Sequence, residues 1–396
     1  MTRFSSKTES IPFSPIRKIF GEAAKLKAQG KDIISLGIGE PDFDTPKHIC
    51  EAMFEATRGG ATHYTPNKGI EELRRAIVDK LKEENNLKYD MEEIICTVGV
   101  SEGVFLALSA LLDPGDEILV PDPSWLNYSH VPRLYNAVPI LYPLTSEDDF
   151  QIRVVELEKL VTEKTKVLVV LDPSNPTGGV QRKEVLEQVA QFAIKHDLIV
   201  ISDEIYEKII YDGNKHYSIA AFPGMKERTI VLNGFAKAYA MTGWRLGYIA
   251  APAELIAPMA KIHAYNVSNA TSMVQWGGVA ALKGTQKPVK EMVEEFKKRR
   301  DFMVKAINNI KGLSCPNPGG TFYLFVDVKK TGMTGEEFAN YLLYEAGVAV
   351  VPGTAFGERA THEIRISYAT SMENLERAMI KIEKAVSQLD NKKLGS

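Results

Sequence analysis

The sequence predicts an α/β fold with a mostly parallel central sheet in a large domain and a smaller α+β domain beside it. From about residue 70 onward, helical patterns alternate with short apolar runs, which is typical of βαβ units. The last third differs, because short strand-like strings there follow a long charged helix. The 396 residues are 44% hydrophobic, which suffices for a large core and two or three folding units.

The elements of the large domain follow one another closely along the chain. An amphipathic pattern predicts the first helix, and an apolar run leading through Gly99 into a second helix predicts the first strand. In chain order we expect a helix at 71–84, a strand at 94–98, a helix at 101–112, a turn at 113–116 and a strand at 117–120. Further buried strands are predicted at 166–171, 198–202 and 229–232, with a helix at 182–195.

The smaller domain is predicted from the C-terminal third. Its pattern comprises a charged helix at 289–309, a glycine-led string at 319–325, another helix, and apolar runs at 348–351 and 364–368. The extended N-terminal segment at 11–15 is expected to pack elsewhere than on the central sheet. We therefore divide the chain into 1–45 (N-terminal arm and part of the small domain), 46–285 (large domain) and 286–396 (C-terminal small domain).

The composition excludes several classes of protein. Lys and Arg number 48 and Asp and Glu 51, a net charge of −3, whereas a dedicated nucleic-acid binder carries a basic excess. No apolar run approaches the ~20 residues of a membrane-spanning helix, and no secretory signal is visible. Cys50, Cys96 and Cys315 are odd in number and lack metal-binding spacing, which indicates reduced thiols and no metal site. We expect a cytoplasmic enzyme without nucleic-acid or membrane partners.

Ligands of open parallel sheets bind beyond the carboxyl ends of the strands, and each predicted strand here is followed by a polar or glycine-containing string. The first strand runs into Val100, Ser101 and Glu102 at a helix start. Amide groups and the helix dipole there favour an anion, although an ordinary helix cap explains the same string. Trp125 follows the second strand, either as a stacking platform for a planar ring or as a core aromatic.

The remaining strands end in residues suited to chemistry. Asn175 lies between two prolines; a turn explains the prolines but not the amide, which can donate to a ligand. Asp203 and Tyr206 follow the next strand, where a buried carboxylate needs a cation or a donor. Lys237 follows the last strand, with Arg245 eight residues on. An internal Asp–Lys ion pair is the alternative explanation for the two charges.

Together these positions offer an amine nucleophile, a carboxylate, a phenol, an amide donor, an aromatic plate, an anion-binding helix start and an arginine. Pyridoxal 5'-phosphate needs this set. Its aldehyde requires a lysine, its ring nitrogen a carboxylate, its phosphate N–H groups and an arginine, and its ring a stacking partner. The combination is more specific than its parts and predicts this cofactor.

Seven longer strings form a series along the chain. They are GEPDFDTP at 39–46, YTP at 64–66, NPTG at 175–178, SDEIY at 202–206, GFAKAYAMTGWRLG at 234–247, VVPG at 350–353 and RISY at 365–368. They resemble, in order, the motifs of class I/II pyridoxal-phosphate-dependent aminotransferases, with a texture most similar to archaeal and bacterial aspartate or aromatic aminotransferases. The resemblance covers about residues 14–388. It implies a fold-type I architecture whose large domain binds the cofactor.

The resemblance implies a role for each matching residue. Lys237 would form the internal aldimine with the cofactor and then shuttle the proton, and Asp203 would pair with the ring nitrogen. Arg365 would clamp the substrate carboxylate in bidentate fashion, helped by Gly39 and Asn175. The other implied cofactor contacts are Tyr206 and Asn175 at the phenolate oxygen, Trp125 on the ring, and Arg245, Val100, Ser101, Glu102 and the partner subunit's Tyr64 at the phosphate. A homodimer with composite active sites follows.

The chain departs from the family at positions that affect the cofactor and the substrate. Gly234 and Ala236 replace serines that many relatives carry near the lysine, so hydroxyl contacts to the phosphate are missing. Ser101 stands where aspartate-selective members carry a lysine. Ile16 stands where a threonine is expected. These changes favour an aromatic or broad specificity, with apolar walls from the arm, including Phe13, and a mobile cation such as Arg17 for a dicarboxylate.

We expect an aminotransferase that moves the amino group of an aromatic L-amino acid or aspartate to 2-oxoglutarate in ping-pong half-reactions. A C–S lyase on the same fold is the alternative, and it would release ammonia and pyruvate from a β-thio amino acid. A cofactor sensor fused to a DNA-binding domain is remote, because no helix-turn-helix or basic extension precedes residue 14. A nicotinamide dehydrogenase is disfavoured, since no GxGxxG follows a predicted strand.

Overall fold

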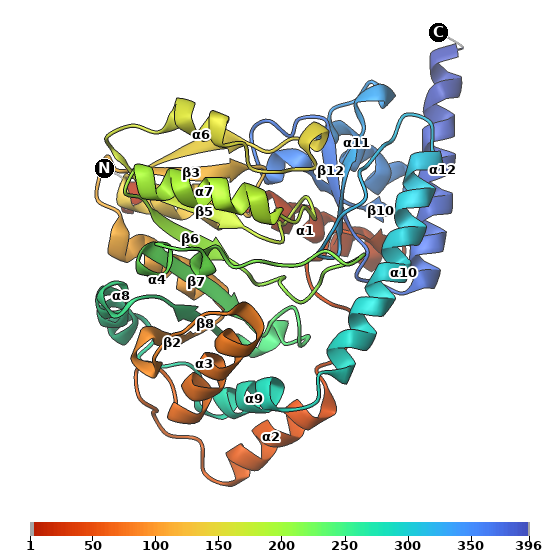
Figure 1. Ribbon diagram of the computed structural model, residues 1–396. Helices are drawn as coiled ribbons and strands as arrows, with labels where there is room; N and C mark the ends of the chain where they lie inside the picture. The colour runs from red at the N-terminus through yellow and green to blue at the C-terminus, as the bar shows by residue number, and fades with distance from the viewer. Residues whose placement is uncertain (1–3, 395–396) are drawn as a thin grey trace.

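The computed structural model describes residues 4–394, and its large domain is built on a seven-stranded sheet (Figure 1). In chain order the strands are β2 (Ile94–Thr97), β3 (Glu117–Asp122), β4 (Val138–Pro143), β5 (Thr165–Leu171), β6 (Ile199–Asp203), β7 (Thr229–Gly234) and β8 (Gly247–Ala250). Their order in the sheet is β2-β8-β7-β6-β5-β3-β4. Strand β8 runs antiparallel to both of its neighbours and every other pair is parallel, so the predicted mostly parallel sheet is confirmed.

Helices cover both faces of this sheet, which explains why its strands read as continuous apolar runs. Successive side chains of a strand point to opposite faces. Leu168 and Val200 therefore pack in the cluster that contains α7, while Val167 and Ile201 pack in the cluster that contains α4 and α8. The helices of this domain are α2 (Lys47–Arg58), α3 (Glu71–Asn85), α4 (Val100–Leu111), α5 (Asn127–His130), α6 (Val154–Leu160), α7 (Lys183–Lys195), α8 (Ala253–Asn266) and α9 (Ser272–Lys283).

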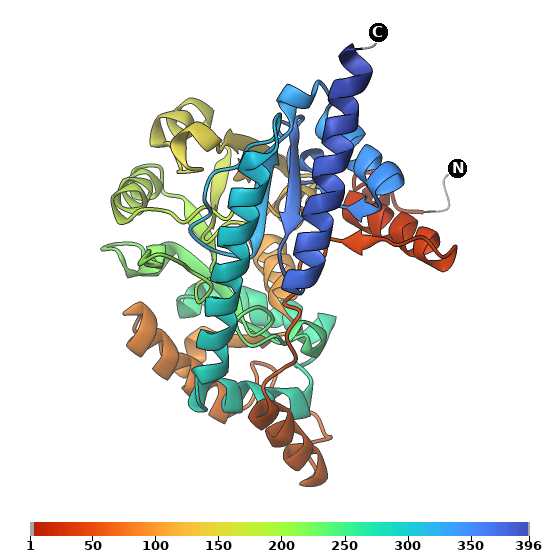
Figure 2. The same cartoon turned by 90° about the vertical axis from the view of Figure 1, so that its right-hand side faces the viewer.

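The small domain contains an antiparallel sheet with the order β11-β12-β9 and a parallel pair of β1 with β10. Its strands are β1 (Ile34–Ser35), β9 (Tyr323–Asp327), β10 (Val348–Ala349), β11 (Val351–Pro352) and β12 (Glu363–Ser367). Its helices are α1 (Pro15–Ala28), α10 (Lys287–Asn309), α11 (Gly335–Tyr341) and α12 (Met372–Leu394). Helices α10 and α12 lie side by side and share one core with β9 and β12 (Figure 2).

The N-terminal segment leads into a helix that begins at Pro15, a residue suited to the first helical turn. Ile16 belongs to an apolar cluster shared by both domains, which includes Leu119 of the central sheet and Val351 of the small domain. The expectation that the segment at 11–15 packs elsewhere than on the central sheet stays a prediction. The division at 1–45, 46–285 and 286–396 stays a prediction, and the pairing of β1 with β10 supports assigning part of the first segment to the small domain.

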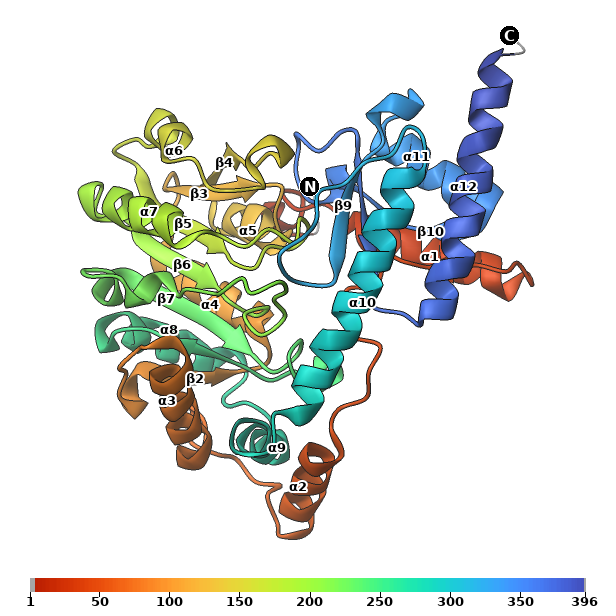
Figure 3. The same cartoon turned by 45° about the vertical axis from the view of Figure 1, so that its right-hand side comes forward.

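The arrangement directs the carboxyl ends of the central strands at the small domain. In Figure 3 the arrowheads of β6 and β7 point toward α10 and β9. Among residues 4–394, no helix is long and apolar enough to cross a membrane. Cys50, Cys96 and Cys315 are free thiols, as expected.

Candidate active site

A cavity of about 700 Å³ lies where the carboxyl ends of β5, β6 and β7 meet the N-terminal segment and β12. Of the residues predicted for the site, those that line it are Gly39, Val100, Ser101, Trp125, Asn175, Asp203, Tyr206, Lys237, Arg245 and Arg365. Glu102 and Tyr64 do not line it. The fold therefore gathers into one place residues that the sequence spreads over more than 300 positions.

Lys237 lies in the turn after β7, with its side chain in the wall of the cavity. Its Nζ donates a hydrogen bond to the carbonyl of Gly39 and lies 5.7 Å from the centre of the Tyr206 ring. Burial of the amine, together with the positive charge of Arg365, lowers the pKa of Lys237 to about 8. A neutral amine is the reactive form of a lysine nucleophile, so this position favours reaction near neutral pH.

Asp203 is the last residue of β6 and is buried. Its Oδ2 accepts a hydrogen bond of 2.8 Å from the Tyr128 hydroxyl, and its Oδ1 accepts one of 3.3 Å from the Ile205 amide. Burial raises the pKa of Asp203 to about 6, although these two hydrogen bonds lower it. Asp203 and Lys237 thus each have other partners. The structure does not show the simple ion pair between them that was the alternative explanation for the two charges.

Arg365 projects from β12 and is only 1% exposed. Its Nη1 donates to Asn175 Oδ1 at 2.9 Å and its Nη2 donates to the Gly37 carbonyl at 2.7 Å. Its guanidinium carbon lies 4.4 Å from the centre of the Tyr323 ring and 4.6 Å from that of Phe356. Among the described residues it has no carboxylate partner, and its Nε has no hydrogen-bond acceptor. A buried cation without an anion calls for an anionic ligand.

The phenols of Tyr206 and Tyr323 lie 2.8 Å apart across the boundary between the two sheets. Tyr206 follows β6, and Tyr323 begins β9. A Cβ on Gly39 would come within 2.8 Å of the Tyr323 hydroxyl, so only glycine allows the N-terminal segment to pass this close. Burial raises the pKa of Tyr206 well above its ordinary value, which keeps its hydroxyl protonated as a hydrogen-bond donor.

The N-terminus of α4 forms a second candidate anion site. Gly99 precedes this twelve-residue helix with φ of +76°, and a Cβ there would lie 2.5 Å from Arg245 Nη2. A Cβ on Gly247 would lie 2.8 Å from the Val100 amide nitrogen. Glycines therefore let a guanidinium and the first amides of α4 converge at one end of the cavity. This arrangement combines a fixed cation with the positive end of a helix dipole.

Glu102 and Tyr64 lie outside the cavity. The Glu102 carboxylate accepts a hydrogen bond from the Val98 amide and faces His263 Nδ1 at 3.0 Å, so only its backbone could serve an anion at α4. Tyr64 is 90% exposed and lies on a separate shallow pocket beside Trp276. Within one chain these two side chains do not join the other predicted site residues.

The wall of the cavity contributed by the arm and by residues 126–134 is largely apolar. Its apolar members are Ile11, Pro12, Ile16, Phe20, Leu126, Val131 and Leu134. Phe13, which we expected to contribute, is fully exposed. Arg17 lines the cavity and has no ion-pair partner among the described residues, and His130 has a buried Nδ1 without a hydrogen-bond partner. This wall therefore offers apolar surface together with one unpaired cation.

Three polar contacts of the site were not predicted from the sequence. They are the Tyr128 hydroxyl on Asp203, the Tyr323 hydroxyl on Tyr206 and the Gly37 carbonyl on Arg365. Tyr128 follows Trp125, beyond the end of a predicted strand. Tyr323 lies in the glycine-led string at 319–325. Both tyrosines therefore belong to segments that the sequence had indicated as unusual. Nothing local in the sequence marks which residue either hydroxyl will contact.

The central sheet is mostly parallel. Its carboxyl edge holds a lysine of lowered pKa, a buried carboxyl group and a buried guanidinium that has no carboxylate partner among the described residues. These features define a fold-type I transferase enzyme. The chain belongs to the class I and II aminotransferase family, whose sequence model matches residues 31–382. It is thus an aminotransferase of a family that in general depends on pyridoxal phosphate, which confirms the resemblance found in the sequence.

Curated relatives with two different names match almost the whole chain. An aspartate aminotransferase of Pyrococcus abyssi is 48% identical over 97% of this chain and 98% of the relative. An aromatic-amino-acid aminotransferase of Thermococcus litoralis is 43% identical over the same shares of the two chains. Among solved structures, the aspartate aminotransferase of Thermus thermophilus with maleate superposes with a TM-score of 0.93 at 38% identity, covering 97% of this chain and 100% of that one.

Proposed function

We propose that this aminotransferase uses pyridoxal 5'-phosphate to move the amino group of an aromatic L-amino acid, and less readily of aspartate, to 2-oxoglutarate. The observation that carries the proposal is the single cavity that holds the Lys237 amine, the Asp203 carboxyl group and the unpaired Arg365 guanidinium. When bound, the cofactor supplies an aldehyde and an electron-withdrawing ring.

The donor set fits this cofactor at both ends. Arg245 and the amides at the start of α4, including those of Val100, Ser101 and Glu102, would hold a phosphate where glycines at 99 and 247 leave room. At the opposite end, Asp203 would hold a protonated ring nitrogen. The Tyr206 hydroxyl and the Asn175 amide would donate to a phenolate oxygen, and Trp125 would stack on the ring.

Lys237 has two tasks in this proposal. Its pKa of about 8 keeps a useful fraction of neutral amine available to meet the cofactor aldehyde. Once substrate has displaced it, the same amine would take a proton from the substrate α-carbon and return it elsewhere on the bound pair. The protonated ring nitrogen of the cofactor would be a cation beside Asp203. It would favour the ionised carboxylate, which burial disfavours.

One carboxylate clamp supports a ping-pong order of reaction. Arg365, oriented by Asn175 and Gly37, is the buried guanidinium without a carboxylate in the described cavity wall. Amino donor and oxo-acid acceptor both carry an α-carboxylate, so both would use this clamp and must bind in turn. The amide of Gly39, which borders the clamp, would add a third donor.

The side-chain specificity is proposed from the wall formed by the arm and residues 126–134. Its apolar residues would receive a tyrosine or phenylalanine ring, whereas Ser101 supplies no cation for a distal carboxylate. Arg17 lies on the same cavity, has no ion pair within residues 4–394, and could accept an aspartate or 2-oxoglutarate side chain. The two names carried by the relatives agree with such a mixed specificity.

A homodimer completes the proposal. Tyr64 is exposed on its own chain, and a composite site would use the partner subunit's Tyr64 at the phosphate. Phe54 of α2, a helix that also borders this shallow pocket, is 58% exposed, so an apolar side chain is available near Tyr64 for such an interface.

The test starts from the purified holoenzyme. Borohydride should fix the cofactor covalently to Lys237, and peptide mapping should find the label there; labelling at another lysine would overturn the central assignment. Glutamate alone should convert the cofactor to its amino form without releasing ammonia. Release of ammonia and pyruvate from a β-thio amino acid would identify a C–S lyase instead.

A further inference from the structure

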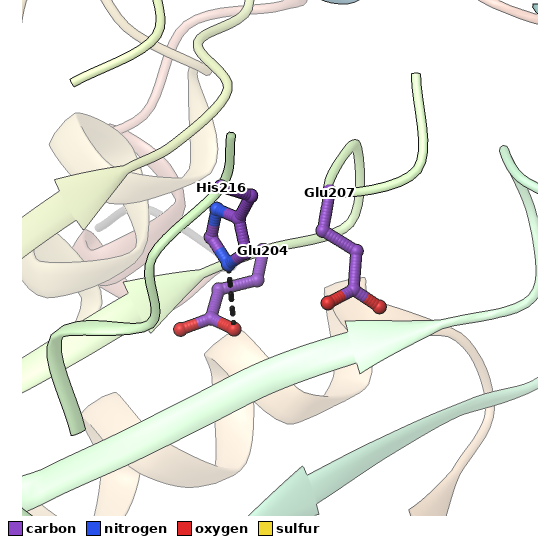
Figure 4. A group of neighbouring side chains, drawn as sticks. All are labelled: Glu204, Glu207 and His216. Atoms are coloured by element: carbon purple, nitrogen blue, oxygen red, sulfur yellow. Dashed lines mark hydrogen bonds and ion pairs between the residues drawn. The ribbon is translucent and has the colours of Figure 1, made fainter. Parts of the chain in front are cut away.

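Behind the cavity, His216 lies between two buried carboxylates. Its Nδ1 is 3.1 Å from Asp172 Oδ2 and its Nε2 is 3.1 Å from Glu204 Oε2. Asp172 and Glu204 directly follow β5 and β6, and His216 comes from the long connection between β6 and β7. Figure 4 shows the imidazole ring set against the Glu204 carboxylate. Nothing in the proposed reaction uses these three groups.

The other contacts of the two carboxylates are all donors. Asp172 Oδ1 accepts from the Gln181 amide at 2.7 Å. Glu204 Oε1 accepts from the hydroxyls of Ser202 at 2.9 Å and Ser218 at 2.6 Å. A neutral imidazole would turn a lone pair toward one of the two carboxyl oxygens that face it, whereas a doubly protonated ring donates to both, so the geometry favours the imidazolium. Burial works against this cation, but the two carboxylates prevail and raise the pKa of His216 to about 10.

A metal ion is the competing explanation of the cluster. Among the described residues, Glu204, Glu207 and His216 offer ligand atoms within 4.8 Å of one another. However, Glu207 forms an ion pair with Lys80 and accepts a 2.7 Å hydrogen bond from Asn85, which lower its pKa to about 2 despite burial. The Glu207 carboxylate is thus already matched by donors, and each nitrogen of His216 already faces a carboxylate oxygen, so a proton on His216 explains the arrangement.

The cluster is connected directly to two residues of the cavity. Asp172 begins the turn that carries Asn175, and its amide donates to the Asp203 carbonyl at 3.1 Å. Glu204 is the next residue after Asp203. We propose that the imidazolium of His216 is a positioning residue that joins the ends of β5 and β6 and so fixes Asn175 relative to Asp203. The proposal rests on the proposed function, in which these two side chains hold the same cofactor ring.

Loss of the cation would have two effects on the site. Two buried carboxylates would face each other across a neutral side chain, which drives the strand ends apart. The charge of Glu204 also raises the pKa of Asp203, and a Glu204 without its imidazolium partner would raise it further. Both effects weaken the hold on a cofactor ring without touching Arg365 or Lys237.

The first experiment measures protonation and needs no cofactor. In the cofactor-free full chain labelled with ¹⁵N-histidine, His216→Gln assigns the signal by its disappearance. Both nitrogens of His216 should remain protonated at pH 8.5. A single protonated nitrogen at that pH overturns the proposal. So does stoichiometric binding of added Zn²⁺ at pH 7.5 that His216→Gln abolishes.

The second experiment measures positioning. His216→Gln should weaken pyridoxal phosphate binding and lower kcat by about 10- to 100-fold, while KM for the amino donor changes less than about threefold. The matched control is His196→Gln, since His196 also contacts a carboxylate, Glu158, at 3.1 Å but lies near the surface. It should leave cofactor binding and kcat unchanged.

A double variant separates positioning from general damage. In Glu204→Gln with His216→Gln, two neutral amides can bond each other and Asp172, so cofactor affinity should recover at least threefold over the single variant. Wild-type affinity and kcat in a folded His216→Gln, or no recovery in the double variant, would overturn the proposal. If the wild type transaminates no donor, the proposed function fails, but the protonation result still stands by itself.

Discussion

Arg365 donates from Nη1 to Asn175 Oδ1 at 2.9 Å although 190 residues separate them. Arg365 belongs to β12 of the small domain, and Asn175 belongs to the turn after β5 of the large domain. The carboxylate clamp is therefore oriented by both sheets, and a shift of one domain relative to the other would change the direction of its donors.

Replacing Arg365 by lysine should lower kcat/KM about 100-fold or more for both tyrosine and 2-oxoglutarate, mostly through KM. Lysine keeps the charge but cannot offer two parallel donors to a carboxylate. Steady-state kinetics with each substrate varied in turn measure this. Arg377→Lys is the control, because Arg377 pairs with Asp32 on the surface. Unequal losses for the two substrates would show that they use different clamps.

Asp203→Asn should weaken pyridoxal phosphate binding and lower kcat by roughly 10³-fold, because a neutral amide cannot hold a protonated ring nitrogen. Tyr128→Phe, which removes one hydrogen bond of about 1 kcal/mol, should lower kcat about tenfold at most. Single-turnover rates with tyrosine measure both. Near-normal rates in Asp203→Asn would show that Asp203 has only a structural role.

Lys237 of the cofactor-free protein should react with a small acylating reagent with a midpoint near pH 8. A base whose pKa is lowered in the folded state loses its proton at lower pH. About half of Lys237 is then neutral at pH 8, against roughly 0.3% of an amine at the ordinary value of 10.5. Competitive labelling followed by mass spectrometry measures the midpoint, with the exposed Lys215 as reference. A midpoint above pH 10 would contradict the pKa assigned to the site.

Mixed dimers should reveal whether Tyr64 serves the neighbouring site. Tyr64→Ala and Lys237→Ala should each be impaired alone. Mixing them under exchange conditions should restore about a quarter of the wild-type activity, because half of the dimers are mixed and each holds one intact site. Sedimentation before and after mixing confirms the dimer. An active monomer, or mixtures no better than their components, would disprove the composite site.

Ser101→Lys should shift the preference from aromatic donors toward aspartate. Ser101 lines the cavity at the start of α4, where a lysine would add a second cation beside Arg245, which the proposal assigns to the phosphate. We expect wild-type kcat/KM for tyrosine to exceed that for aspartate, and the ratio to fall at least tenfold (~1.4 kcal/mol) in the variant. If the wild type prefers aspartate by more than tenfold, another cation, with Arg17 as the first candidate, reads the distal carboxylate.

The sequence was sufficient to predict strands β2, β3, β5, β6 and β7 of the central sheet and most of the cavity wall. Their apolar runs are continuous because helices cover both faces of the sheet. The polar residues of the site come directly after the carboxyl ends of these strands. The predicted helices at 71–84, 101–112 and 182–195 agree with α3, α4 and α7 to within one residue at each end.

Two strands of the central sheet and several contacts could not be predicted in this way. Strand β8 has four residues and follows the signature string without a break, and β4 contains prolines and is partly exposed, so neither gives a clear apolar pattern. The bonds from Tyr128 to Asp203 and from His216 to Asp172 join residues 75 and 44 positions apart. Such contacts depend on how the sheet is assembled, which local spacing does not encode.

The Gly37 carbonyl binds Arg365 and the Gly39 carbonyl binds Lys237, so a three-residue stretch of main chain orients two of the cations that line the cavity. Every amino acid carries the same carbonyl, and a point mutation cannot delete either acceptor. Mutation at 37–39 can only add bulk, and a Cβ at Gly37 or Gly39 would press on Val351 or Tyr323. The two carbonyl acceptors therefore depend on the path of the backbone and not on the identity of a side chain. Side chains elsewhere in the cavity can change, and with them the preferred substrate, while both acceptors stay in place.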